Sequence, residues 1–137
     1  MMVYVNGQDI ARLVLGSLYG NRWLHAPESL EIRPEGYLLG LEMWLQKLNI
    51  DRADIMGFVL VKGPGSATAL RTSHAMVNAL AFALGVQVVS IEKEPQALDA
   101  EIVATLSEHA PHAFALPTYA HEPTITKTNR DALKRKV

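Results

Sequence analysis

One stretch of the sequence, residues 56–84, joins a short apolar run, a loop of glycine and proline, and a long alanine-rich segment. The apolar run, residues 56–61, has the length and residue types of a fully buried strand. The segment that follows Ser66 is too long for a strand and is rich in helix formers. Ser66 itself stands where an N-cap belongs, because its side chain can accept a bond from a backbone N–H of the first turn. The stretch therefore predicts a strand, a rigid loop and a helix in an α/β fold.

The loop and the first turn of this helix carry the motif Gly-Pro-Gly-Ser-Ala-Thr-Ala-Leu-Arg over residues 63–71. The motif resembles the Gly-Pro-Gly-Ser-Phe-Thr-Gly-Leu-Arg pattern of the TsaB (YeaZ) family, the partner subunit of the bacterial machine that makes threonylcarbamoyladenosine in tRNA. Ala67 and Ala69 depart from the pattern. The matching residues are Gly63, Pro64, Gly65, Ser66, Thr68, Leu70 and Arg71. We expect the loop to shape the start of the helix, with a phosphate held on its N–H groups as the alternative role.

The order of apolar runs and turn signals predicts three antiparallel strands followed by alternating helices and strands. The expected elements are strands at 1–5, 10–18 (with a bulge at Gly16) and 22–26, a helix at 34–48, a strand at 55–61, a helix at 66–84 and a strand at 86–91. Asn6-Gly7 and Gly20-Asn21 are expected to be the turns of the antiparallel part. The order β-β-β-α-β-α-β fits one lobe of the actin-like (ribonuclease H-like) fold, which the family resemblance also implies.

The C-terminal part is expected to add a helix at 99–109 and a strand at 112–116, which would complete a domain over residues 1–116. Residues 117–137 form a tail. From Lys127 to the end there are five basic residues and one acidic residue, so this part carries +4 and the remaining body −5. A solvated terminus is the simpler interpretation, and contact of the tail with RNA or an acidic partner is the alternative.

Each predicted helix has two apolar faces. The stripes expected to face the sheet are Leu38, Leu41, Leu45 and Leu48 on the first helix, and Leu70, Ser73, Val77, Leu80 and Leu84 on the second. The opposite faces hold Gly36, Leu39, Gly40, Met43 and Lys47, and then Arg71, Ala75, Asn78, Ala79 and Phe82. Small residues beside large apolar ones favour close packing of helices from a partner or from a second copy of the chain. Burial of the first helix on both sides within one domain is the alternative.

The sequence argues against catalysis and against a resident cofactor. His74 lies eight residues beyond Ser66, too far along a helix to be its general base. The chain has no cysteine, and its histidines at 109, 112 and 121 lack the pattern of a metal site. In the stretch Asn6-Gly7-Gln8-Asp9 the carboxylate is displaced from the place where kinases of the actin-like superfamily hold phosphate, so no nucleotide site is expected there. ATP or ADP is expected only at an interface with a partner.

Absence of cysteine, of a signal peptide and of a long apolar span favours a cytoplasmic protein. The resemblance implies a non-catalytic scaffold that binds a TsaD-like transferase, with a TsaE-like ATPase as a further partner, in tRNA modification. It implies contact with tRNA only indirectly or through the tail, and a homodimer when no partner is present. The alternatives are a minimal peptidase-like or ATP-hydrolysing member of the same superfamily, and a stand-alone homodimeric binding protein.

Overall fold

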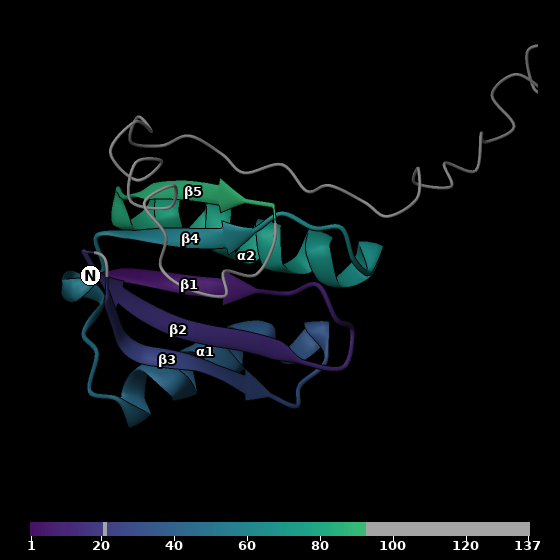
Figure 1. The fold of residues 1–137 in the computed structure, drawn as a ribbon, viewed down its shortest axis with the longest axis horizontal. Coiled ribbons are helices and arrows are strands. Elements are labelled where there is room, and N and C mark those ends of the chain that lie inside the picture. The colour runs from purple at the N-terminus through teal and green to yellow at the C-terminus, as the bar shows by residue number, and fades with distance from the viewer. Residues whose placement is uncertain (21, 93–137) are drawn as a thin grey trace, which may run out of the picture.

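The computed structural model describes residues 1–20 and 22–92, which form a five-stranded sheet in the order β3-β2-β1-β4-β5 with two α-helices (Figure 1). The strands are β1 (Met2–Asn6), β2 (Leu13–Tyr19), β3 (Arg22–Leu30), β4 (Gly57–Val61) and β5 (Gln87–Ile91). The helices are α1 (Tyr37–Lys47) and α2 (Ala67–Leu84), with short 3₁₀ turns η1 (Pro34–Gly36) and η2 (Arg52–Asp54). The predicted order of elements is confirmed through β5, and the fold is of the predicted α/β class with a mixed sheet.

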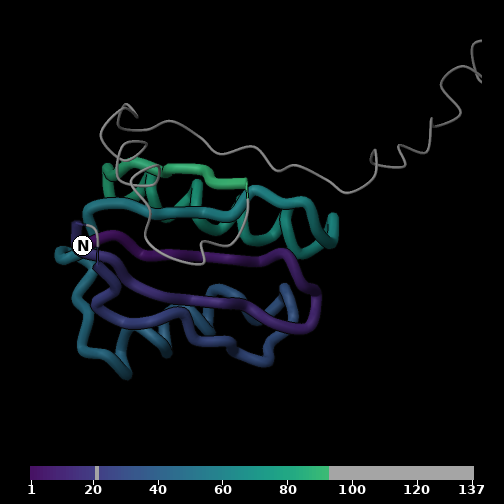
Figure 2. The backbone as a smooth tube through the Cα atoms, in the orientation of Figure 1, coloured from purple at the N-terminus to yellow at the C-terminus, as the bar shows by residue number. Residues whose placement is uncertain are grey.

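The first three strands form the expected antiparallel meander, with β1 at the centre of the sheet (Figure 2). Tyr19 pairs with Arg22 across the predicted second turn, where Gly20 takes a positive φ of 60°. The pairing of β2 with β3 shifts register between Leu15 and Ser17, so the predicted bulge at Gly16 is confirmed. β3 is longer than expected because Pro27 lies in an edge strand, where a missing N–H breaks no ladder.

The predicted tight turn at Asn6-Gly7 is wrong. Asn6 still belongs to β1 and pairs with Val14, and the connection runs over residues 7–12. Its shape comes from side chains, since the backbone N–H of Gln8 donates to Asn6 Oδ1 over 3.1 Å. Gly7 does not have a positive φ; it is required because a Cβ there would lie 2.6 Å from Ser73 Cβ on α2. Close approach of loop and helix, rather than hairpin geometry, explains this glycine.

The second half of the sheet is parallel, as predicted. β4 pairs in parallel with β1 on one side and with β5 on the other. The predicted caps of α2 are also confirmed: Ser66 Oγ accepts a bond from the N–H of Ala69, and Gly85 ends the helix in the left-handed conformation at φ 68°.

The first helix begins at Pro34 as predicted, through the 3₁₀ turn η1. Its inner stripe differs from the predicted leucine stripe. Leu41 and Leu45 are buried, whereas Leu38 is half exposed, and Tyr37 and Trp44 are buried in its place. These large aromatic side chains fill the space between the helix and the sheet, so the buried face of α1 contains them and not Leu38.

Both helices lie on the same face of the sheet, behind the strands in the view of Figure 1. The core between them and the sheet includes Val3, Val5 and Leu60 from the strands. No helix in residues 1–20 or 22–92 has the length and hydropathy needed to cross a membrane. The expected helix at 99–109, the strand at 112–116 and the tail at 117–137 lie outside the described residues.

Candidate functional site

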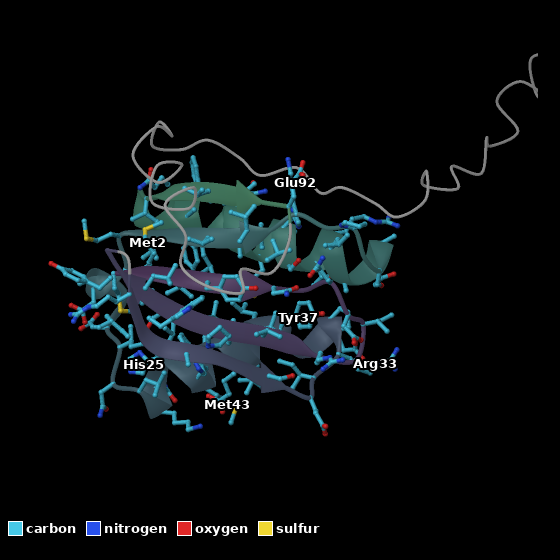
Figure 3. The ribbon with its side chains drawn as sticks, viewed as in Figure 1. Met2, His25, Arg33, Tyr37, Met43 and Glu92 are labelled. Carbon is cyan, nitrogen blue, oxygen red and sulfur yellow. The ribbon has the colours of Figure 1, made fainter. Side chains whose placement is uncertain are left out.

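The outer surfaces of α1 and α2 carry large apolar side chains that stay exposed. Leu39 is 62% exposed, Met43 60% and Phe82 69% (Met43 is at the lower margin of Figure 3, clear of the strands). Ala75 and Ala79 on α2 are exposed as well. Leaving such side chains in water forgoes burial worth about 1.5–3 kcal/mol each, and their occurrence on the outer sides of two contacting helices is typical of a surface that binds. We call the residues Leu39, Met43, Arg71, Ala75, Ala79 and Phe82 the helix face.

The glycines of α1 have a different role from the one the sequence suggested. A Cβ on Gly40 would clash with the side chain of Ile32, and the nearest atom to a Cβ on Gly36 would be Ile32 Cβ at 3.9 Å. Gly40 therefore makes room for a residue of this chain, in the connection from β3 to α1, rather than for a helix of another. The structure leaves the alanines of α2, not the glycines of α1, as the small exposed residues of the helix face.

The charges around the helix face are partly paired. Lys47 Nζ lies 3.1 Å from Glu28 Oε1, and Arg52 Nη2 lies 3.3 Å from Glu42 Oε1. Arg71 is exposed and makes no ion pair with another residue of the described ranges. It is also the only Lys, Arg, Asp or Glu of α2. A carboxylate brought by a partner would find this guanidinium available.

The Gly-Pro-Gly-Ser loop is joined to the β1–β2 loop by two hydrogen bonds. The backbone N–H of Ser66 donates to Gln8 O over 2.9 Å, and Gln8 Nε2 donates to Pro64 O over 2.8 Å. A Cβ on Gly65 would lie 2.6 Å from Gln8 O, so only glycine allows this approach. Because the Ser66 N–H is already bonded, one of the donors that a loop-bound phosphate would need is used within the chain. These contacts favour the structural role of the motif.

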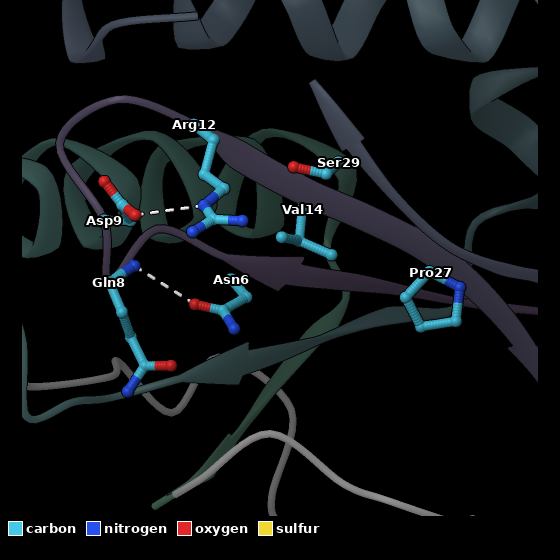
Figure 4. A pocket seen from close by; sticks show the side chains of 7 residues that line it. All are labelled: Asn6, Gln8, Asp9, Arg12, Val14, Pro27 and Ser29. Atoms are coloured by element: carbon cyan, nitrogen blue, oxygen red, sulfur yellow. Dashed lines mark hydrogen bonds and ion pairs between the residues drawn. The ribbon is translucent and has the colours of Figure 1, made fainter. Parts of the chain in front are cut away.

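A pocket of about 340 Å³ opens beside the β1–β2 loop (Figure 4). It is lined by Asn6, Gln8, Asp9, Arg12, Val14, Pro27 and Ser29. Arg12 Nε donates to Asp9 Oδ2 over 3.0 Å, and its guanidinium lies between Asp9 and Val14 in Figure 4. The sequence pattern was interpreted as a turn at Asn6-Gly7 with no nucleotide site, and it did not indicate Arg12, Pro27 or Ser29 as site residues. Pro27 and Ser29 reach the loop through the pairing of β3 with β2, and Arg12 through the wider loop that replaces the predicted turn.

Two groups near this pocket have shifted pKa values. The backbone N–H of Ala11 and the side chain of Arg12 donate to Asp9 and hold the pKa of its carboxyl below 3.8, so Asp9 is ionised at neutral pH. Burial, with the negative charges of Asp9 and Glu35, raises the pKa of Tyr37 to about 12. The Tyr37 hydroxyl therefore stays protonated and donates to Asp9 O over 3.2 Å, which ties α1 to the loop.

A serine–histidine contact, which the sequence analysis also missed, lies on β2 and β3. Ser17 Oγ is 2.6 Å from His25 Nδ1, and the His25 ring packs edge-on against Trp44 (His25 is labelled in Figure 3). Ser17 is completely buried, so no substrate could reach its hydroxyl. The register shift at Gly16, which brings the two residues together, could not be read from the sequence. Within the described ranges, no three His, Asp or Glu side chains are grouped to hold a metal ion.

The mixed sheet and the paired helices define the class of protein, an α/β protein of the actin-like fold. Two solved structures share this fold: YeaZ from Pseudomonas aeruginosa, with a TM-score of 0.56 and 19% identity, and a crystal structure described as an uncharacterised protein with similarity to peptidase YeaZ from the same organism, with a TM-score of 0.56 and 18% identity. Each match covers 66% of this chain and 42% of the other.

Residues 40–119, more than half of the chain, match the model of the family described as TsaD, tRNA N6-adenosine threonylcarbamoyltransferase, and the chain belongs to this family. A curated relative with the same description, from Ralstonia pickettii (strain 12J), is 47% identical over 51 residues. That match covers 37% of this chain and 15% of the relative, so the chain corresponds to a small part of the transferase it resembles. The expected likeness to YeaZ is thus confirmed by the fold, while the sequence comparisons point to the related transferase.

Proposed function

We propose that the chain takes part in threonylcarbamoyladenosine modification of tRNA as a TsaB-like subunit that binds a TsaD-like transferase without catalysing the reaction itself. The observation that carries this proposal is the helix face, where Leu39, Met43 and Phe82 are exposed beside the alanines of α2. The segment that matches the transferase family, residues 40–119, contains most of this face. Membership of that family supports the proposal that the chain takes part in tRNA modification.

The contacts of the reactive side chains support binding rather than catalysis. Ser66 caps α2, and the imidazole of His74 is held by Leu70 O at 2.7 Å on the same helix. Ser17, the serine that does touch a histidine, is inaccessible. None of these groups forms an exposed nucleophile with a base beside it. A TsaE-like ATPase is a second proposed partner, with ATP or ADP bound at an interface rather than within this chain.

The proposal is tested by mixing the purified chain with a purified TsaD-like transferase and measuring mass by size-exclusion chromatography with light scattering. Phe82→Ser should weaken the complex by at least about tenfold, because a large aromatic side chain that becomes buried on binding is typically a hot spot. Leu24→Ser, at a half-exposed leucine of β3, is the matched control and should leave binding unchanged.

Other outcomes separate the alternatives. A homodimer that ignores the transferase and dissociates in Phe82→Ser would support the stand-alone homodimeric protein. Steady hydrolysis of added ATP by the chain alone would support the ATP-hydrolysing alternative. Binding of the transferase that is equally strong in Phe82→Ser and in the unmodified chain would remove the helix face from the account.

A further inference from the structure

The pocket beside the β1–β2 loop presents two opposite charges side by side. Asp9 and Arg12 are joined by a single bond, from Arg12 Nε to Asp9 Oδ2 over 3.0 Å. The two terminal nitrogens of the Arg12 guanidinium have no bond to another described residue, and both side chains line the pocket. About half of each side chain remains exposed, so a small molecule can reach both charges.

The other lining residues add polar groups of both kinds and two apolar walls. Asn6 is nine-tenths buried, and within the described residues its amide makes two hydrogen bonds, to the Gln8 N–H and over 3.4 Å to the Tyr4 hydroxyl. An asparagine amide has the capacity for about four hydrogen bonds, so Asn6 can still contact a ligand. Val14 and Pro27 supply apolar surface on the side away from the loop (Figure 4).

The opposite charges of Asp9 and Arg12 leave the pocket without net charge, and this distinguishes between anionic, cationic and doubly charged ligands. A phosphate that approached the Arg12 guanidinium would also face the ionised Asp9 carboxylate, and like charges at such distances repel. A simple cation that approached the Asp9 carboxylate would be repelled by the Arg12 guanidinium. A ligand that carries both charges avoids both penalties, provided that its charges are as close together as those of the pocket.

The ammonium and carboxylate of an α-amino acid are separated by one carbon, so their atoms lie about 2.5–3 Å apart. This short spacing suits two opposite charges that are themselves in contact, since Arg12 Nε lies 3.0 Å from Asp9 Oδ2. From this geometry we propose that the pocket binds a free α-amino acid with a small aliphatic side chain. The carboxylate contacts the terminal nitrogens of Arg12, the ammonium contacts Asp9, and the side chain lies against Val14 and Pro27. The pocket shares no residue with the helix face, so this inference is independent of the proposed function.

The test is a titration of the ¹⁵N-labelled full chain, followed by two-dimensional NMR. L-alanine and L-valine should give saturable shifts at the amides of residues 8–14. Four further probes separate the possible causes: acetate, methylammonium, 6-aminohexanoate, whose charges are far apart, and inorganic phosphate. Each should bind at least about tenfold more weakly than L-valine, the factor expected from losing one charge-assisted hydrogen bond.

Two variants locate the site. Arg12→Gln and Asp9→Asn should each weaken L-valine binding by at least about tenfold. The matched controls are Arg33→Gln and Glu35→Gln, which neutralise another exposed ion pair, with a 3.4 Å contact, outside the pocket. The controls should leave binding unchanged.

Several results would overturn the inference. Shifts with phosphate or acetate that saturate as early as those with L-valine would make the pocket an anion site. Equal affinity for 6-aminohexanoate would show that charge spacing plays no part. The absence of any saturable shift with either amino acid would remove the site altogether, and this result comes from the unmodified chain, so it stands even where a variant fails to fold.

Discussion

Gly65 shows how one residue can fix the contact between two loops. A Cβ at this position would lie 2.6 Å from Gln8 O and 2.9 Å from Gln8 Cα, both backbone atoms that cannot move aside without shifting the β1–β2 loop. Gly65→Ala should therefore lower the free energy of unfolding by about 1–3 kcal/mol, as overpacking usually does. Urea unfolding followed by fluorescence measures this as a lower midpoint.

The control for this variant is Gly36→Ala. The nearest atom to a Cβ there is Ile32 Cβ at 3.9 Å, which is an ordinary contact, and Gly36 does not have a positive φ. The change should stay within about 0.5 kcal/mol. Equal decreases in the free energy of unfolding in the two variants would mean that an added methyl group is destabilising at either glycine. The close contact between Gln8 and Gly65 would then not be the cause.

His74 makes stability depend on pH. Leu70 O can only accept, so His74 Nδ1 carries the proton of their 2.7 Å bond, and Nε2 is left buried without a partner among the described residues. Burial, opposed by the bond to Leu70, lowers the pKa of His74 below 6.5. The unfolded chain therefore binds a proton in a range of pH where the folded chain does not, and the free energy of unfolding falls as pH drops below 6.5.

This dependence is measurable by thermal unfolding between about pH 8 and about pH 5.5, the range in which histidine titrates. The unmodified chain should be insensitive to pH above the ordinary histidine value and should lose stability below it. His74→Leu, which cannot be protonated, should show a smaller loss over the same range. The same slope in both proteins would assign the pH dependence to other groups.

At the scale of a helix, the cap of α2 is the interaction that the sequence identifies most directly. The N–H of Ala69 donates to Ser66 Oγ over 3.4 Å, a long bond, so Ser66→Ala should cost about 0.5–1 kcal/mol, the lower part of the range for N-caps. Binding to the transferase should survive, since Ser66 is not part of the helix face. Circular dichroism during thermal unfolding gives the first quantity, and light scattering the second.

Thr68→Ala is the matched control for the cap, because Thr68 is exposed in the same turn and its side chain makes no hydrogen bond to another described residue. Thr72 bonds to the backbone carbonyl of Thr68, which the change leaves in place. Only Ser66→Ala should lower the melting temperature measurably. Loss of transferase binding in a Ser66→Ala protein with unchanged melting would instead give the loop a direct role in contact with a ligand or partner.

Elements that depend on local sequence were predictable, and those that depend on distant contacts were not. The strand, loop and helix over residues 56–84 follow from chain length, helix propensity and capping, all of which are local. The Asn6-Gly7 turn was mispredicted because Gly7 is required by Ser73, far along the chain on α2. Periodicity alone likewise predicted Leu38 as buried and overlooked Tyr37. The buried face of α1 is determined by the volume of its aromatic side chains, which the spacing of the leucines does not show.

At the scale of the whole molecule, a sheet covered by two helices on one face presents their outer surfaces together. The sequence predicted the residues of the helix face by exclusion, as those left over from the inner stripes, together with Gly36, Gly40, Lys47 and Asn78. Leu39, Met43 and Phe82 are exposed, whereas Gly36, Gly40 and Asn78 are half-buried. The pocket was not predictable in this way, because it draws Asn6, Arg12 and Ser29 from three separate segments. The exposed residues of each helix can be predicted from the periodicity of that helix alone, whereas a site formed between strands depends on the register in which the strands pair.

The central claim, that the helix face binds a partner, is tested most directly at Ala79. This residue is exposed on α2, so Ala79→Arg should leave the circular dichroism spectrum and melting temperature unchanged. An arginine there should block packing of another helix by its bulk and charge and weaken the complex with the transferase by at least about a hundredfold. Leu24→Arg on β3 is the control that should bind normally. Light scattering of each variant with the transferase decides: loss of the complex only in Ala79→Arg is the expected result, and a folded Ala79→Arg protein that still forms the complex at full affinity would contradict the account.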